Sequence, residues 1–110
     1  MTCIRSDPAV LTVLYVDDEP DLLDIARIFL EHSGNFTIET CTSVSEAEAK
    51  LQEKHYDAIV SDYQMPEKDG IAFLKYIRGT YGRIPFILFT GKGREEVVIQ
   101  ALENGADFYL

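Results

Sequence analysis

The sequence predicts an α/β domain built on a doubly wound parallel sheet. Five short apolar runs begin near residues 10, 36, 57, 85 and 107, and segments with helical spacing of apolar residues separate them. Each repeat takes roughly 25 residues, which is room for one strand, one helix and two short loops. Strand-helix alternation implies right-handed crossovers and a parallel sheet with helices on both faces. The nearly continuous apolar strands agree, since strands buried on both faces need no alternation.

The first unit is predicted from residues 10 to 33. Residues 10 to 16 are rich in Val, Leu and Tyr and end abruptly at Asp17-Asp18-Glu19, which is typical of a buried strand. Pro20 suits the first turn of a helix, and Ser33-Gly34 ends the helical pattern. The apolar residues between them predict one buried face made of Leu22, Ile25, Ala26, Phe29 and Leu30.

The second and third units follow the same plan. Residues 36 to 41 alternate like a strand, and Ser43 with Glu46 makes a capping box ahead of a helix. Residues 56 to 61 predict the third strand, and Asp69-Gly70 opens a third helix that is expected to end before Gly79. The inward-facing residues of these two helices are predicted to be Val44, Ala47, Leu51, Ile71, Leu74 and Ile77.

The remaining residues predict a fourth strand at 85 to 89, a helix at 94 to 104 that presents Val98, Ala101 and Leu102, and a fifth strand at 107 to 110. We therefore expect residues 1 to 110 to be one domain, truncated within or just after the fifth strand, with the last helix absent. A sheet wound on both faces then predicts an exposed apolar strip beside the first and fifth strands.

Composition excludes several classes of protein. The 19 Asp and Glu residues outnumber the 10 Lys and Arg residues, for a formal charge of −9, which disfavours direct binding of nucleic acid. No apolar run reaches the roughly 20 residues of a membrane helix. Cys3 and Cys41 form no CxxC pair, so neither a zinc site nor a disulfide framework is indicated. With no secretory leader pattern at the start, we expect a cytoplasmic location.

Polar residues follow three of the predicted strands. The carboxyl ends of parallel strands share one edge, so Asp17, Asp18, Asp62 and Thr90 are expected on one rim. Carboxylates gathered there resist full ionisation unless a cation joins them. Mg²⁺ is the natural cation, because it prefers hard oxygen ligands and uses few carboxylates.

The spacing also suggests a division of roles. The pair Asp17-Asp18 would hold the metal, and Asp62, alone at its strand end, would accept a phosphoryl group as an acyl phosphate. Thr90 would donate its hydroxyl to a phosphoryl oxygen. Plain structural interpretations stand beside these: a helix cap for Asp18, a turn for Asp62 and a β-branched strand end for Thr90.

Four segments carry a family resemblance. They are residues 13 to 19 (VLYVDDE), 61 to 70 (SDYQMPEKDG), 85 to 90 (PFILFT) and 104 to 110 (NGADFYL). In this order and at these separations, they resemble the receiver domain of two-component response regulators over about residues 10 to 110. The resemblance implies a flavodoxin-like fold with strand order 2-1-3-4-5.

The resemblance also implies residue roles. Asp62 would be the phosphoacceptor, Asp18 a direct Mg²⁺ ligand and Asp17 a ligand mostly through water. The main-chain carbonyl of Gln64 would be the third protein ligand. Thr90 and Tyr109 would be the switch hydroxyl and the switch aromatic.

The chain departs from the family at one position. The family lysine follows the fifth strand three places after the switch aromatic, and this sequence ends one place after Tyr109. Lys92 lies two residues past Thr90, but a solvated loop lysine is the plainer interpretation.

The resemblance implies a signalling module rather than an enzyme. A sensor histidine kinase or phosphotransfer domain would donate to Asp62, and the face made by the fourth helix and fifth strand would switch to engage an effector. Two rivals remain: a magnesium phosphohydrolase with an aspartyl nucleophile, and a phosphate-independent interaction module of the same fold. The sequence leaves the effector and homodimerisation open.

Overall fold

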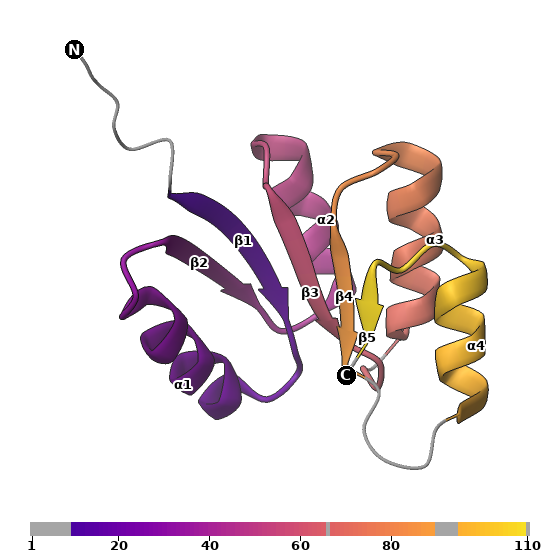
Figure 1. The fold of residues 1–110 in the computed structure, drawn as a ribbon, viewed down its shortest axis with the longest axis horizontal. Helices are drawn as coiled ribbons and strands as arrows, with labels where there is room; N and C mark the ends of the chain where they lie inside the picture. Colours follow the sequence, from indigo (N-terminus) through magenta and orange to yellow (C-terminus); the bar gives the residue numbers. More distant parts are fainter. Residues whose placement is uncertain (1–9, 66, 90–94, 110) are drawn as a thin grey trace.

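The computed structural model describes residues 10–65, 67–89 and 95–109, and these form an alternating series of strands and helices (Figure 1). The elements in chain order are β1 (Leu11–Val16), α1 (Pro20–Glu31), β2 (Phe36–Cys41), α2 (Val44–Glu53), β3 (Ala58–Asp62), α3 (Gly70–Thr80), β4 (Phe86–Phe89), α4 (Glu95–Glu103) and β5 (Phe108–Tyr109). The predicted α/β alternation is confirmed.

All strand pairs are parallel, and the strands lie in the order β2-β1-β3-β4-β5. This order confirms the doubly wound sheet and the order that the resemblance implied. Successive residues of a strand face opposite sides of the sheet. Leu14 and Val16 therefore join the core beneath α2, α3 and α4, whereas Val13 joins Ile38 and Val60 on the side of α1 (Figure 1).

Side chains at the helix ends explain where two helices begin. The Ser43 side chain accepts a hydrogen bond from the Glu46 amide at 3.1 Å, and Glu46 in turn accepts from the Thr42 amide at 2.8 Å. Asp69 caps α3 by accepting from the Ala72 amide at 2.9 Å. These contacts satisfy amide groups that have no partner within the helix.

The structure corrects three predicted details. Gly79 lies inside α3, which continues to Thr80, because Gly82 rather than Gly79 takes the left-handed conformation, with φ of 76°. The third strand runs from 58 to 62, so Asp62 is its last residue instead of following it. In α4, Ala101 is buried as predicted, but Leu102 is exposed, and Val97 rather than Val98 is the other buried residue.

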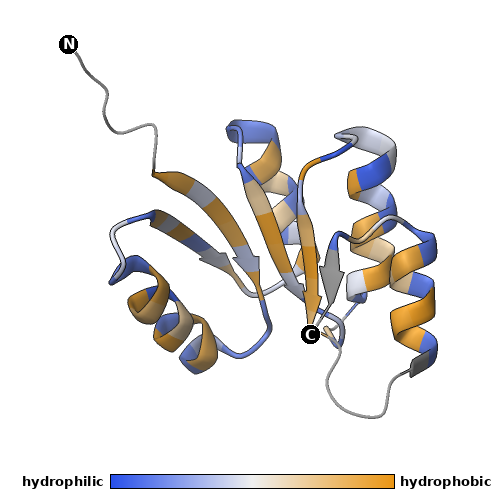
Figure 2. Cartoon of the chain, viewed as in Figure 1, coloured by the Kyte–Doolittle hydropathy of each residue, from blue (hydrophilic) through white to orange (hydrophobic). Residues whose placement is uncertain are grey.

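The apolar face predicted for α1 is largely uncovered. Leu23 is the only buried residue of this helix, and the exposed fractions of Leu22, Ile25 and Phe29 are 49%, 65% and 77%. Figure 2 shows apolar residues along the helix. The side chain of Glu31 accepts a hydrogen bond from the Ile38 amide at 2.8 Å, which holds α1 toward β2.

A groove therefore remains between α1 and the β1-β3-β4 surface. Its lining is almost entirely apolar and consists of Tyr15, Ala26, Phe29, Leu30, Val60, Ile87 and Phe89. The groove has the place predicted for an exposed apolar strip beside β1, but Val60 is buried and Tyr15, Ile87 and Phe89 are half-buried, so the prediction holds only in part. The side chains of β5 are outside the described residues. No helix among the described residues has the length and apolar character needed to span a bilayer.

Candidate functional site

Three aspartates from two neighbouring strands meet at the carboxyl edge of the sheet. Asp17 and Asp18 follow β1, and Asp62 ends β3, the strand that pairs with β1. One carboxylate oxygen from each lies within 4.8 Å of the others. Asp18 is exposed, and Asp17 and Asp62 are half-buried. For the three aspartates, the geometric expectation drawn from the strand ends therefore agrees with the structure.

Backbone contacts hold these acids in place. The Asp17 amide donates to the Cys41 carbonyl at 3.1 Å, which extends the pairing of β1 with β2 by one residue. The Asp17 carboxylate accepts a hydrogen bond from the Glu19 amide at 3.0 Å. On the other strand, the Tyr63 amide donates to the Phe89 carbonyl at 2.8 Å. These contacts continue the strand pairing to Asp17 and to the residue after Asp62.

Gly70 brings the start of α3 against the end of β3. Its amide donates to the Tyr63 carbonyl at 2.8 Å, and a Cβ added to it would lie 2.6 Å from the Asp62 carbonyl oxygen. A Leu88 methyl group would be equally close. A Cβ at that distance would clash, so only glycine lets the start of α3 approach the end of β3 this closely. From local sequence patterns, Gly70 is recognisable as a helix start but not as this point of close approach.

Mutual repulsion and burial disfavour the charged forms of the acids. Partial burial, then the nearby Asp17 charge, raises the pKa of Asp62 to about 6. Burial likewise raises the pKa of Asp17, although the hydrogen bond from the Glu19 amide opposes this. Such a site is short of positive charge, which is the condition under which a cation binds.

The raised pKa predicts a pH-dependent stability effect. Because the pKa of Asp62 is about 6 in the folded state, folding favours its protonated form. This contribution to the free energy of unfolding is fully present below pH 4 and is lost as the pH rises through 6. In the presence of EDTA, Asp62→Asn is therefore expected to stabilise the domain by about 1 kcal/mol at pH 7, after allowance for solvent screening, and by much less at pH 4. Urea unfolding at both pH values measures this. A gain of equal size at both values would contradict it.

The residues beyond β3 form an open pocket next to the acids. It is lined by Asp18, Tyr63, Gln64, Met65 and Asp69. Gln64 therefore lies near Asp18, as the resemblance implied, and the role of its carbonyl stays a prediction. Thr90 and Lys92 lie outside the described residues. Tyr109 is in β5, paired with Leu88, and its side chain is likewise not described.

Sequence reasoning missed Tyr15 as a neighbour of the acids. Its ring stacks on Phe89 with centroids 6.0 Å apart. Burial, followed by the charges of Asp17 and Asp62, raises the pKa of its hydroxyl. Strand alternation contained the signal, because Tyr15 and Asp17 are two residues apart and share a face. One pocket includes Tyr15, Asp17 and Asp62 and joins the acidic edge to the apolar groove beside α1.

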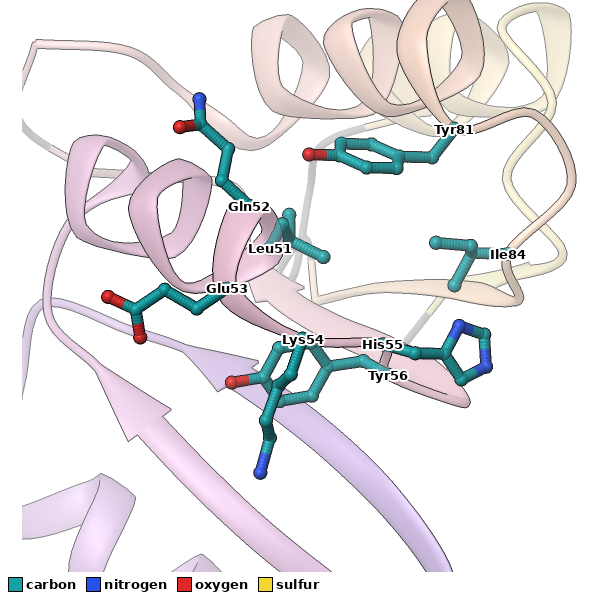
Figure 3. Close-up of a pocket in the computed structure, with 8 residues that line it drawn as sticks. All are labelled: Leu51, Gln52, Glu53, Lys54, His55, Tyr56, Tyr81 and Ile84. Carbon is teal, nitrogen blue, oxygen red and sulfur yellow. The ribbon is translucent and has the colours of Figure 1, made fainter.

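A further pocket lies at the opposite edge of the sheet, between the ends of α2 and α3. Figure 3 shows Leu51, Tyr81 and Ile84 around it, with the polar ends of Gln52 and Glu53 pointing away. Two of its polar groups have partners outside it: Tyr56 donates to Glu39 at 2.6 Å, and Lys54 pairs with the same carboxylate. We assign this pocket to packing.

Comparison with known proteins identifies the class. Residues 13–110 match the family model described as the response regulator receiver domain. The chain belongs to this family of signalling domains.

Individual relatives agree. Response regulator SaeR of Staphylococcus aureus is 39% identical over 98 residues, which cover 89% of this chain and 42% of that protein. Response regulator Rre1 of a Synechocystis strain is 32% identical over 102 residues, covering 91% of this chain and 44% of that protein. The chain thus spans less than half the length of these relatives.

Solved structures show the same fold. The receiver domain of the Francisella response regulator 1452 has a TM-score of 0.83 and 30% identity, covering 91% of this chain and 82% of that one. A response regulator receiver domain from Clostridium thermocellum has a TM-score of 0.85 and 28% identity, covering 91% and 80%.

Proposed function

We propose that residues 1 to 110 act as a phosphorylation-controlled receiver domain in which Asp62 accepts a phosphoryl group. The observation that carries this proposal is the meeting of Asp17, Asp18 and Asp62 within 4.8 Å at a solvent-accessible strand edge. The family match supports it, since receiver domains interact with histidine kinases and with effector domains. A kinase or phosphotransfer domain is the proposed donor, and a cytoplasmic location follows from these partners.

The acids fit a hard divalent cation. They supply oxygen donors, their charges are mutually repulsive, and one of them is exposed enough to leave room for water ligands. Asp18 and Asp62 would hold Mg²⁺ directly, Asp17 through water, and Gln64 through its carbonyl. When bound, the ion would neutralise charge on the phosphoryl oxygens.

The protein would promote the transfer by holding the reacting carboxylate in position. A carboxylate oxygen of Asp62 attacks phosphorus, the bond from phosphorus to the donor nitrogen breaks, and an acyl phosphate forms. The strand edge fixes the carboxylate for in-line approach. We infer that Thr90 and Tyr109 then respond and alter the face of α4 and β5.

Two rival functions make different predictions. A magnesium phosphohydrolase would turn over a phosphoester many times, and the haloacid-dehalogenase type of such enzymes needs a second acid two residues after the nucleophile, where this chain has Gln64. A phosphate-independent module of the same fold would not bind Mg²⁺ at the acidic edge.

Phosphorylation with acetyl phosphate tests the proposal. With Mg²⁺ present, intact-mass spectrometry of the wild type is expected to show the addition of one phosphoryl group, and Asp62→Asn is expected to show none. Asp57→Asn is the matched control, because Asp57 lies at the amino end of β3, away from the acids, and should leave the modification intact. Equal modification of Asp62→Asn and wild type would overturn the assignment.

A further inference from the structure

A single arginine bonds to four residues at the edge of the sheet opposite the acids. Arg78 lies in the last turn of α3, and its side chain is only 15% exposed. Its Nε and Nη2 donate to the Gly105 carbonyl at 3.0 and 2.7 Å. Its Nη1 donates to the carbonyls of Gly82 and Ile84, both at 2.8 Å. Nη2 also pairs with the Asp107 carboxylate at 3.1 Å.

The contacts connect α3 with the segment between α4 and β5. Asp107 accepts a second hydrogen bond, from the Phe86 amide at 2.9 Å, which links the same cluster to the start of β4. Gly105 takes a left-handed φ of 91°, and a Cβ there would lie 3.1 Å from the Arg78 Nε. The turn is therefore shaped to admit the guanidinium. Hydrogen bonds from a charged donor such as this guanidinium are about twice as strong as those between neutral groups.

Few side chains of α4 are buried. Val97 and Ala101 are its buried side chains among the described residues, whereas Ile99 and Leu102 are 57% and 53% exposed. Segments with little buried apolar surface open at low free energy. The carboxyl end of α4 and the segment after it are held by Arg78, by the buried Ala101 and by the Asp107 amide, which donates to the Phe86 carbonyl at 3.0 Å. The amino end of α4 lies toward the acidic edge (Figure 1).

We propose that Arg78 is a positioning residue that anchors the carboxyl end of α4 and the start of β5, so that the state of Asp62 moves α4 about a fixed end. This inference rests on the proposed function for its signal. With the anchor in place, a change at the acidic edge repositions the helix; without it, α4 and β5 loosen as a unit and the change is not transmitted.

Hydrogen–deuterium exchange tests the anchor. Arg78→Lys keeps the charge but cannot make the forked contacts to Gly105, Gly82 and Ile84. Without any phosphoryl donor, exchange over residues 95–109 is expected to rise about tenfold relative to wild type, with β1 and β3 unchanged. Asp107→Asn, which removes the ion pair and leaves an oxygen for the Phe86 amide, is expected to give a smaller rise. The control is Arg27→Lys, since Arg27 is an exposed arginine on α1.

The second arm adds Mg²⁺ with beryllium fluoride, and acetyl phosphate in parallel. Phosphorylation of Asp62 in Arg78→Lys is expected to stay within about twofold of wild type, while the ligand-induced change in exchange over 95–109 is lost. If the ligand-induced change in exchange over 95–109 were as large in Arg78→Lys as in wild type, the proposed transmission through Arg78 would be wrong. If the donor-free exchange of Arg78→Lys equalled that of Arg27→Lys, or rose throughout the sheet, the proposed anchoring of α4 by Arg78 would be wrong. If wild type showed neither phosphorylation nor a change in exchange, the proposed function and the proposed transmission would both be wrong. The measurement without phosphoryl donor would still test whether Arg78 anchors α4.

Discussion

Replacing Asp18 with asparagine is expected to weaken Mg²⁺ binding by at least about 100-fold. Loss of a supporting contact to a metal ligand already weakens binding by about 10- to 100-fold, and this substitution removes a proposed ligand charge itself. Asp18 is the exposed member of the three acids, so its substitution removes charge without leaving a buried group unpaired. The fold should therefore survive the change.

Calorimetric titration of Mg²⁺ at pH 7 measures this effect. Asp24→Asn is the matched control, because Asp24 is an exposed aspartate on α1 whose side chain lies 3.7 Å from Arg27. It removes the same formal charge at a distance from the acids and should change the affinity less than about threefold through long-range electrostatics. Wild-type affinity in Asp18→Asn, or an equal loss in Asp24→Asn, would show that the ion binds elsewhere.

The second large effect is expected at Gly70. Gly70→Ala should destabilise the domain by about 2–3 kcal/mol, because the new methyl group would lie 2.6 Å from the Asp62 carbonyl oxygen and must displace backbone. The displacement falls on the strand end that carries Asp62. Acceptance of a phosphoryl group from acetyl phosphate should therefore slow as well.

Gly79→Ala provides a control in the same helix. Nothing lies within 4 Å of the added methyl group there, so the expected effect has the opposite sign: a stabilisation of about 0.5–1 kcal/mol from helix propensity. Urea unfolding of the two variants compares the same substitution in two environments. Similar effects at both positions would mean that the close approach at Gly70 does not constrain the site.

Most of the element order could be predicted from local patterns. Residues 11 to 16 and 36 to 41 are strands as expected, and the Ser43 and Glu46 capping contacts form as their spacing indicated. The convergence of Asp17 with Asp62 followed from the rule that parallel strands end on one edge. Boundaries that depend on the next element were less predictable, as the continuation of α3 through Gly79 shows.

The sequence by itself determined the alternation of strands and helices and the gathering of three aspartates, because periodicity and strand ends are encoded within a few neighbouring residues. The sheet order was implied by the family resemblance and not by these local patterns. Only the tertiary structure decided that α1 leaves Phe29 exposed, that Gly70 must lack a side chain and that Arg78 joins residues 27 and 29 positions away. Such contacts depend on how whole elements pack against each other. The local sequence of one helix or strand does not determine its distance from another.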